Sequence, residues 1–412
     1  MNNKTNKTEA LMQLEDRYGA HNYHPIPVVL ERGEGVYVWD VDGKRYYDFL
    51  SAYSAVNQGH CHPKIIDTLI RQSQKLTLTS RAFYNNKLGP YEQFITEYFG
   101  YEKVLPMNTG AEAVETAIKL CRKWAYERKG IAENQAKIVV CENNFHGRTT
   151  TIVSFSVDPD AYTHYGPYTP GFVVIPYNDA EALEKLLRED KNIAGFLVEP
   201  VQGEAGAYVP DYGYLKKCAD LCRAHNVLFI ADEVQTGIAR TGKLLACDYE
   251  NVHPDILILG KALSGGAYPV SAVLSSNEIM EVIHPGQHGS TFGGNPVAAA
   301  VAVAALEVVR DEKLAEKAYE LGIYFREAMK KLCDESEIAS FVRGKGLLNA
   351  LVINNEGHKN LAWDICLKLA ENGLLAKPTH TNIIRFAPPL VITRTQLDEC
   401  IEIINTAVKS FV

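Results

Sequence analysis

Two residues whose side chains could do chemistry follow short apolar runs in the middle of the chain. Residues 227–231 run directly into Asp232, and residues 256–259 are followed by Gly260 and Lys261. If both runs are strands connected by one crossover, the two side chains end at the same edge of a sheet. A lysine amine there can form a Schiff base with an aldehyde cofactor, and an aspartate can hold a pyridine nitrogen protonated. Spacing alone also fits a solvated lysine and an aspartate that caps a helix.

Two other segments carry groups that suit a phosphate. Residues 108–113 bring small residues to the start of a helical pattern. A helix start binds phosphate through its free amides and its dipole, although a plain helix cap has the same composition. Residues 290–294 combine two hydroxyls with two glycines, which also fits an ordinary turn. Neither segment distinguishes these interpretations by itself.

Two further patterns do not support a function. Residues 237–243 have the spacing of a nucleotide-binding P-loop, but Leu244 stands where a serine or threonine must bind Mg²⁺. His60 and His62 flank Cys61, but adjacent side chains point apart and no obvious partner ligands follow. We therefore expect neither a P-loop ATPase nor a metal site.

The elements that must position these residues alternate between strands and helices. Continuous short apolar runs suit strands that are buried on both faces of a parallel sheet. The candidate strands are residues 138–141, 172–175, 196–198, 227–231, 256–259 and 272–274. Residues 214–225 have the pattern of an amphipathic helix, and Asn295 with Pro296 begins another helix. This alternation predicts an α/β fold with a large, mostly parallel central sheet and helices on both faces.

The two ends of the chain differ from this middle part. Residues 35–43 alternate like a strand and end in an Asp-Gly turn, whereas the chain beyond residue 295 is mainly amphipathic helix with a few strands. We expect an N-terminal arm (1–50) that contributes to a small α+β domain, a large α/β domain (51–295) and the C-terminal small domain (296–412).

The composition excludes several classes of protein. With 412 residues, 46% of them hydrophobic and 22% charged, the chain resembles an ordinary globular protein of two domains. The net charge of −8 argues against a nucleic-acid partner. No apolar run reaches the roughly 18 residues of a membrane span. Nine scattered cysteines without a CxxC motif indicate reduced thiols, so we expect a cytoplasmic protein, mitochondrial only if a presequence was removed.

Five longer motifs run through the chain: residues 20–25, 51–63, 198–206, 231–237 and 259–266. Together they resemble the class III aminotransferases of pyridoxal-phosphate (PLP) fold type I. The resemblance extends from about Tyr18 to the C-terminus. It implies PLP as the cofactor and a homodimer with shared active sites.

The resemblance also implies roles around the cofactor ring. Lys261 would hold the cofactor covalently and move a proton between substrate and cofactor, and Asp232 would pair with the pyridinium nitrogen. Phe145 would stack on the ring, and Gln235 would lie near its hydroxyl. Family members often carry tryptophan or another residue where His146 stands, so we assign His146 no role.

The phosphate group would be shared between two subunits. By the resemblance, Gly110 and Ala111 would hold it through their backbone amides. Thr291, with Ser290, would complete the phosphate site of the neighbouring subunit, which makes the dimer necessary for activity.

The resemblance implies a substrate through three residues. Tyr23 and Tyr53 with Arg148 would hold the α-amino acid end of L-ornithine away from the cofactor, because a guanidinium binds a carboxylate and a phenol can orient an amine. Related N-acetylornithine and 4-aminobutyrate aminotransferases generally lack the tyrosine pair. We expect transfer of the distal amino group to 2-oxoglutarate, giving L-glutamate and glutamate 5-semialdehyde. The alternatives are N-acetylornithine and 4-aminobutyrate as donors, with the tyrosines as ordinary packing residues.

The second substrate, 2-oxoglutarate, brings one more carboxylate into the same pocket. In the family a glutamate masks an arginine in the first half-reaction and releases it in the second. Glu204 and Arg385 stand at the matching positions. Pairing would neutralise a charge that is otherwise buried without a partner. Once freed, Arg385 would bind the α-carboxylate while Arg148 takes the distal one.

Overall fold

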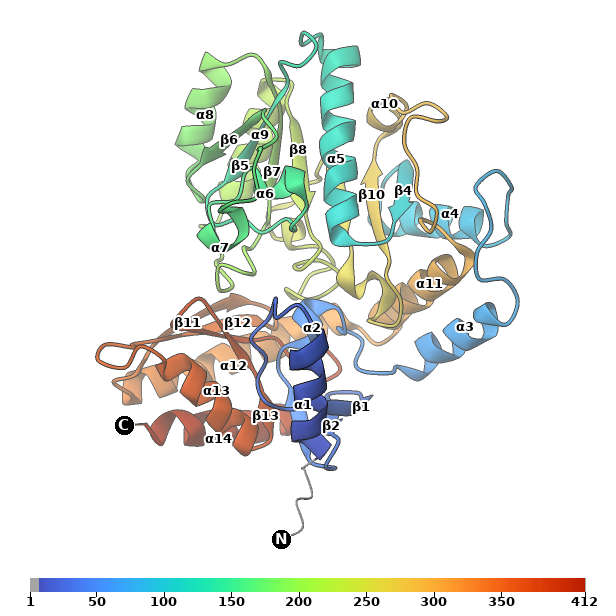
Figure 1. The fold of residues 1–412 in the computed structure, drawn as a ribbon. Coiled ribbons are helices and arrows are strands. Elements are labelled where there is room, and N and C mark those ends of the chain that lie inside the picture. The colour runs from blue at the N-terminus through green and yellow to red at the C-terminus, as the bar shows by residue number, and fades with distance from the viewer. Residues whose placement is uncertain (1–6, 412) are drawn as a thin grey trace.

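The computed structural model describes residues 7–411 and has two regions (Figure 1). The upper one, which we call the central-sheet region, is built on a seven-stranded sheet. The lower one, the two-sheet region, contains two four-stranded sheets. The predicted domain boundaries at residues 50 and 295 stay predictions.

The central sheet has the strand order β4-β10-β9-β8-β7-β5-β6. Its strands are β4 (Lys103–Met107), β5 (Lys137–Cys141), β6 (Phe172–Ile175), β7 (Ile193–Val198), β8 (Leu228–Asp232), β9 (Ile256–Leu259) and β10 (Ser271–Ser275). Strand β10 is antiparallel to both β4 and β9, and the pairs from β9 through to β6 are parallel. The expected α/β fold with a mostly parallel sheet is therefore confirmed. Each of the six candidate strands lies in it, and β4 is an addition.

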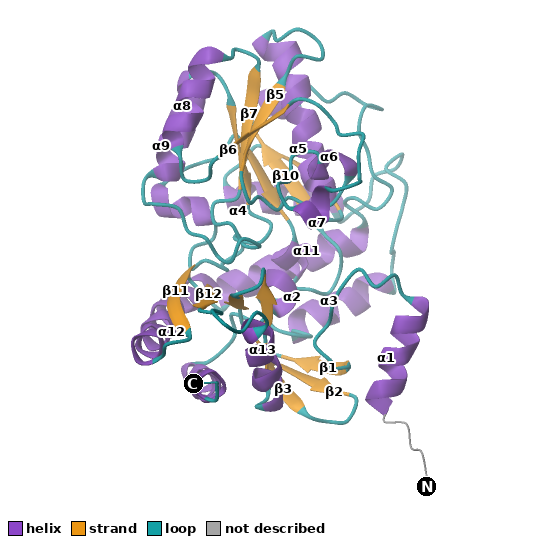
Figure 2. Ribbon diagram, turned by 60° about the vertical axis from the view of Figure 1, so that its left-hand side comes forward, coloured by secondary structure: helices purple, strands orange, loops and turns teal. Residues whose placement is uncertain are grey.

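Helices cover both faces of this sheet (Figures 1 and 2). Alternate residues of β5 show the two faces, since Ile138 and Val140 pack against α5 while Val139 packs against α8 and α9. Burial on both faces explains why these strands are apolar without alternation. The helices of this region are α4 (Leu88–Phe99), α5 (Gly110–Trp124), α6 (Thr150–Val153), α7 (Pro159–Tyr162), α8 (Ala180–Glu189), α9 (Tyr214–Ala224) and α10 (Asn277–Met280). Short helical turns span Ala125–Lys129 (η1), Ala246–Glu250 (η2) and Lys261–Ser264 (η3).

The two-sheet region combines segments from both ends of the chain. One sheet has the order β1-β2-β3-β13 and the other β11-β12-β15-β14. The strands are β1 (Leu30–Glu34), β2 (Tyr37–Asp40), β3 (Arg45–Asp48), β11 (Ala339–Lys345), β12 (Leu348–Ile353), β13 (Leu374–Leu375), β14 (Lys377–Thr379) and β15 (Ile383–Phe386). Tyr47 of β3 pairs in parallel with Leu374 of β13, so the N-terminal strands are completed by a strand near the C-terminus.

The remaining helices pack beside and between these sheets. They are α1 (Lys7–Tyr18), α2 (Ser51–Ser54), α3 (Pro63–Ser73), α11 (Pro296–Asp311), α12 (Leu314–Glu335), α13 (Leu361–Glu371) and α14 (Arg394–Lys409). The predicted helix start at Asn295 is confirmed, because its side chain accepts a hydrogen bond from the amide of Ala298 at 2.9 Å. No helix among the described residues is long and apolar enough to cross a membrane.

The P-loop-like segment 237–243 lies at the junction of the two regions. Arg240, which is fully buried, donates to the side chain of Asn57 at 2.6 Å and to the carbonyls of Leu347 and Pro388 at 2.9 and 2.7 Å. Its guanidinium therefore joins three segments that are far apart in the sequence. This structural role explains the segment, and a bound nucleotide is not needed to account for it.

The histidines that flank Cys61 bind different carboxylates. His60 Nε2 lies 2.7 Å from Asp48, and His62 Nε2 lies 2.9 Å from Glu312. Among residues 7–411, no three histidine, cysteine, aspartate or glutamate side chains gather as metal ligands would.

Candidate active site

Asp232 and Lys261 meet at one edge of the central sheet, as their positions after two apolar runs predicted. Asp232 ends β8, Lys261 follows β9, and the two strands are parallel neighbours. Both side chains line a cavity of about 180 Å³. Six of the predicted residues line this cavity: Gly110, Ala111, Phe145, Asp232, Gln235 and Lys261.

Lys261 sits at a sharp change of chain direction. Its φ of 45° is in the left-handed region, and Gly260 before it packs against the start of α5. A Cβ on Gly260 would lie 3.6 Å from the Cα of Gly110, an ordinary contact distance. Burial lowers the pKa of Lys261, with Glu204 and Asp232 opposing the shift. An amine with a lowered pKa is more often neutral, which is the form that attacks an aldehyde.

Asp232 is almost completely buried and is held by two donors. Nδ1 of His146 lies 2.7 Å from Oδ2, and the amide of Val234 lies 3.1 Å from Oδ1. Its carboxylate therefore has a fixed orientation at the cavity wall. Sequence reasoning missed His146, whose only signal was its place next to Phe145 after the end of β5.

The contact with Asp232 raises the pKa of His146. Burial would lower the pKa of His146, but the hydrogen bond and the charge of Asp232 outweigh burial and raise it. Nε2 of His146 is buried without a hydrogen-bond partner among the described residues. This nitrogen is thus a buried polar atom that no other described residue satisfies.

A second buried carboxyl, Glu199, follows β7 in the same wall. It accepts the amide of Phe145 at 2.9 Å and that of Gly203 at 3.3 Å. Burial raises the pKa of Glu199 to about 7, and the nearby Asp232 adds to the shift while His146 opposes it. Through the Phe145 amide this group fixes the loop that carries the aromatic ring.

The start of α5 forms another side of the cavity. Thr109 caps the helix by accepting the amide of Glu112 at 3.2 Å, and the Glu112 carboxylate accepts the amide of Thr109 in return. The amides of Gly110 and Ala111 lie in the first turn, where a helix offers no internal acceptor. A Cβ on Gly110 would come within 3.0 Å of a methyl group of Val234, so a larger residue here would have to displace that side chain. The predicted anion site at residues 108–113 is thus in contact with the lysine cavity.

Glu204 and Arg385 form an ion pair next to this cavity. Arg385 Nη1 lies 2.7 Å from Glu204 Oε1, and the Gln235 amide group donates to the same oxygen at 3.2 Å. Burial would raise the pKa of Glu204, but Arg385 outweighs it and lowers the pKa. Gln235 therefore connects the ion pair to the lysine cavity.

The predicted substrate residues Tyr53, Tyr23 and Arg148 are placed differently from one another. The Arg385 guanidinium lies 4.9 Å from the centre of the Tyr53 ring. Burial raises the pKa of Tyr53, and charge effects from Glu204 and Tyr23 add to it while Arg385 opposes it. Tyr23 is 70% exposed, and Arg148 is exposed with its guanidinium 5.8 Å from the Phe145 ring centre. Tyr53 thus lies against the arginine of the ion pair, whereas Tyr23 and Arg148 are exposed.

Tyr53 is presented by a left-handed turn. Residues 51–54 all have φ between 46° and 73°, a conformation that costs roughly 1–2 kcal/mol per residue. Asp48 holds the entry to this turn by accepting the amides of Leu50 and Ser51 at 2.8 and 2.9 Å. Strain of this kind is retained where the surroundings fix it, commonly at functional sites.

Ser290 and Thr291 lie outside the lysine cavity. They line a separate hollow of about 490 Å³ together with residues 78–81. The hydroxyl of Ser290 accepts the side chain of Asn108 and the amide of Gly293, both at 2.9 Å. Within one chain these hydroxyls do not reach the wall formed by Lys261 and Asp232.

Residues 18–408, nearly the whole described chain, match the family described as aminotransferase class-III. The chain belongs to the class-III aminotransferases. This aminotransferase is 61% identical over 404 residues to the mitochondrial ornithine aminotransferase of Drosophila melanogaster, covering 98% of this chain and 92% of the relative.

Two solved structures are also similar to this aminotransferase. The ornithine aminotransferase of Toxoplasma gondii has a TM-score of 0.97 at 49% identity, covering 99% of this chain and 96% of the relative. The acetylornithine aminotransferase of Elizabethkingia anophelis has a TM-score of 0.91 at 63% identity, covering 99% of this chain and 100% of the relative. The fold is therefore PLP fold type I, as predicted.

PLP is the cofactor of this family, and the cavity fits it. Lys261 would supply an amine for the aldehyde, and Asp232 would supply a buried carboxylate for the ring nitrogen. The first turn of α5 would supply backbone amides for the phosphate. This aminotransferase is a PLP-dependent enzyme.

Proposed function

We propose that this aminotransferase transfers the distal amino group of L-ornithine to 2-oxoglutarate. The observation that carries the proposal is the Glu204–Arg385 ion pair, whose arginine lies over the Tyr53 ring and next to the lysine cavity. An arginine that is masked by a carboxylate suits an enzyme that must accept substrates with different numbers of carboxylates at one site. The names of the T. gondii and D. melanogaster relatives support the same substrate.

Residues of the chain itself would transfer the protons and position the cofactor. Bound PLP supplies an aldehyde for the amino group and a ring that withdraws electrons from the neighbouring carbon. Lys261 Nζ, whose pKa burial lowers, would take a proton from the substrate carbon. The Asp232 carboxylate would hold the ring nitrogen protonated, with His146 fixing its orientation. Gly110 and Ala111 would bind the phosphate, Phe145 would cover the ring, and Gln235 would lie near the ring hydroxyl.

Selectivity for ornithine would come from the outer end of the site. Arg148 would bind the α-carboxylate bidentately, and the hydroxyls of Tyr23 and Tyr53 would orient the α-amino group. The distal amine would then be the one that reaches Lys261. The contact between the Tyr53 ring and Arg385 supports this role for Tyr53, and the exposed Tyr23 and Arg148 would close on a bound substrate.

The Glu204–Arg385 pair would act as a charge switch. With ornithine bound, Glu204 would neutralise Arg385. No unpaired buried cation would then face the uncharged part of the substrate. With 2-oxoglutarate bound, Arg385 would leave Glu204 and take the α-carboxylate while Arg148 takes the distal one. The product of the first half-reaction, glutamate 5-semialdehyde, would cyclise to pyrroline-5-carboxylate.

We further propose a homodimer in which the hollow at Ser290 and Thr291 completes the phosphate site of the partner. Large aromatic side chains next to this hollow support the pairing, because Phe83, Tyr84 and Phe292 are 70%, 106% and 49% exposed. Such residues are typical of a surface that is buried in an assembly. A cytoplasmic location stays a prediction, and the D. melanogaster relative is named as mitochondrial.

A half-reaction without keto acid tests the substrate. Holoenzyme would be mixed separately with L-ornithine, N-acetylornithine and 4-aminobutyrate, and the change in visible absorbance of the cofactor would be followed. Conversion that is fast only with ornithine, with pyrroline-5-carboxylate as product, supports the proposal. No conversion with ornithine contradicts it.

N-acetylornithine is the second candidate donor, because the E. anophelis relative is named acetylornithine aminotransferase at 63% identity. An acetyl group removes the charge of the α-amino group, which the two tyrosine hydroxyls would otherwise orient. Faster conversion of N-acetylornithine in the same assay would favour this candidate and leave the roles of Lys261 and Asp232 unchanged.

A further inference from the structure

Glu204 is carried by a tight loop whose base is fixed by the central-sheet region. Gln202 and Tyr208 pair through two backbone hydrogen bonds of 3.0 and 2.9 Å. Gly206 and Ala207 in the loop have φ of 93° and 51°. These left-handed residues turn the chain so that consecutive carbonyl groups point away from the sheet.

Strands of the two-sheet region bind these carbonyls one after another. The hydroxyl of Thr379 on β14 donates to the carbonyl of Glu204 at 2.8 Å. Arg343 on β11 donates from Nη2 to Ala205 at 3.0 Å and from Nε to Gly206 at 2.7 Å. We call Arg343 and Thr379 the carbonyl clamp.

Arg343 is held in place for this contact. Its guanidinium lies 5.1 Å from the ring centre of Tyr208 and 5.9 Å from that of Phe341. A Cβ on Gly206 would lie 2.9 Å from Arg343 Nη2 and 2.8 Å from Ile383, so only glycine admits the arginine at this distance. The planar guanidinium matches two neighbouring carbonyls, and bonds from a charged donor are roughly twice as strong as neutral ones.

We propose that Arg343, with Thr379, is a positioning residue that keeps Glu204 on Arg385 and thereby sets the choice between substrates with one and with two carboxylates. The clamp binds the backbone carbonyls of the Glu204 loop, and its hydrogen bonds do not involve the Glu204 carboxylate. Glu204 therefore swings on and off Arg385 by rotating its side chain against a fixed backbone. The inference rests on the proposed switch between Glu204 and Arg385.

Loosening the clamp should expose Arg385 more often. In holoenzyme carrying Arg343→Met, which keeps the apolar stem, glutarate should bind up to about tenfold more tightly by calorimetry. A factor of this size corresponds to the loss of one charge-assisted hydrogen bond. The ratio of kcat/KM for L-glutamate over L-ornithine in half-reactions should rise by a similar factor. Thr379→Val, which removes a single hydroxyl bond, should shift both quantities in the same direction by less, and it tests the same claim if Arg343→Met folds poorly.

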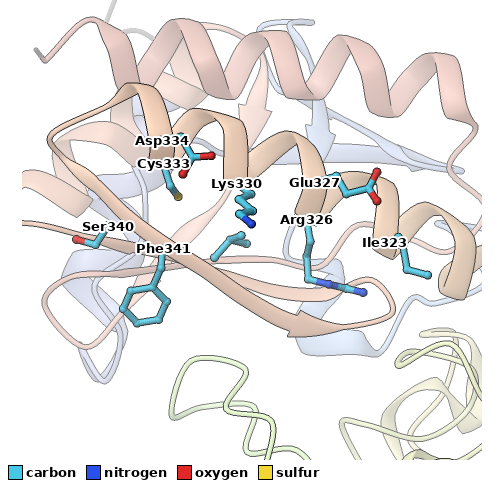
Figure 3. Close-up of a pocket in the computed structure, with 9 residues that line it drawn as sticks. Ile323, Arg326, Glu327, Lys330, Cys333, Asp334, Ser340 and Phe341 are labelled. Carbon is cyan, nitrogen blue, oxygen red and sulfur yellow. The ribbon is translucent and has the colours of Figure 1, made fainter.

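Arg326 provides a matched control. It is a partly buried arginine on α12 that lines a different pocket (Figure 3), and it donates to the carbonyl of Gly346 at 2.8 Å and to Asn349 at 2.9 Å. Arg326→Met should leave glutarate affinity unchanged. An equal gain in affinity in this variant would overturn the proposal, because it would indicate a general loosening of the region.

A double variant separates the clamp from the switch. In the Glu204→Ala background, Arg343→Met should cause no further change in glutarate affinity, because the clamp acts through Glu204. An unchanged or weaker affinity in Arg343→Met alone, or a full effect in the double variant, overturns the proposal. Failure of the proposed function would instead appear as no conversion of L-ornithine by the parent enzyme, whereas glutarate binding is measured without any amino donor.

Discussion

Nδ1 of His146 lies 2.7 Å from Oδ2 of Asp232, and both side chains are almost excluded from solvent, at 0% and 5% exposure. The imidazole donates this hydrogen bond, because an ionised carboxylate only accepts. The bond fixes the aspartate that faces the cavity and raises the pKa of the histidine against the effect of burial. The pair therefore belongs to the cofactor wall, although the two residues come from loops after β5 and from the end of β8.

Replacing His146 should weaken cofactor binding. In His146→Phe the Asp232 carboxylate loses its buried partner, and we expect the dissociation constant of PLP to rise about tenfold. His146→Asn keeps an N–H donor near the position of Nδ1 and should restore most of the affinity. Equal affinity in the two variants, measured by equilibrium dialysis of the cofactor, would show that the hydrogen bond has no such role.

Lys261→Ala should keep the fold and abolish turnover. Removal of the amine takes away both the attachment of the cofactor and the proton carrier, so we expect kcat to fall by at least ~10³-fold. The exposed Lys217→Ala on α9 is the control and should keep full activity. Circular dichroism would check the fold, and appreciable multiple turnover in Lys261→Ala would refute the assignment of this residue.

Tyr53→Phe should change donor selectivity. The variant keeps the ring under Arg385 and removes only the hydroxyl, so kcat/KM for L-ornithine should fall roughly 10- to 100-fold. The rate with N-acetylornithine should change little, because that donor lacks the charged α-amino group. Tyr212→Phe, at a tyrosine that is 85% exposed, serves as the control. An equal loss of kcat/KM with both donors would mean that Tyr53 has only a packing role.

Glu204→Ala should alter the balance between the two half-reactions. Without its masking carboxylate Arg385 stays free. We therefore expect the rate of the glutamate half-reaction, divided by that of the ornithine half-reaction, to rise about tenfold. Stopped-flow absorbance of the cofactor with each donor measures the ratio. If both half-reactions and the donor selectivity stay unchanged, the charge switch is wrong.

The stability of the protein should depend on the buried carboxyl of Glu233. Burial raises the pKa of Glu233 to about 7, so between its ordinary pKa of 4.5 and this value the folded state keeps a proton that the unfolded state loses. Stability from this group is therefore full at low pH and falls as pH rises through that window, by roughly 3 kcal/mol in total. Glu233→Gln should remove this dependence.

Urea unfolding at about pH 5 and about pH 8 checks the Glu233 effect. The loss of unfolding free energy between the two values should be smaller by about 2–3 kcal/mol in Glu233→Gln than in the parent protein. Glu402→Gln removes an exposed carboxyl of α14 and should leave the difference unchanged. An identical pH dependence in Glu233→Gln and the parent would contradict the buried, protonated state.

The central sheet and its two catalytic candidates were predictable because burial on both faces leaves a simple signal. Strands β8 and β9 are uninterrupted apolar runs, and polar residues appear where each strand reaches the cavity. Strand β4 has a proline and a lysine among its five residues and an edge position, so its pattern is weaker. Strand β11 also lies at the edge of its sheet, and most of its residues are only partly buried. It therefore lacks a continuous apolar run.

The contacts across the site were less accessible to sequence reasoning. His146 and Asp232 are separated by 86 positions, and nothing local to either residue marks the other. The family pattern selected Glu204 and Arg385, and their ion pair is present. Ser290 and Thr291 lie in a different hollow, and the contacts within one chain do not bring them to Lys261.

The parallel pairing of Tyr47 with Leu374 has a consequence for synthesis on the ribosome. The N-terminal strands leave the exit tunnel early, yet their sheet partner is translated more than three hundred residues later. The left-handed turn that presents Tyr53 follows these strands directly, so it lacks its final support during most of translation. The nascent chain can therefore assemble the central sheet before the N-terminal strands gain their parallel partner.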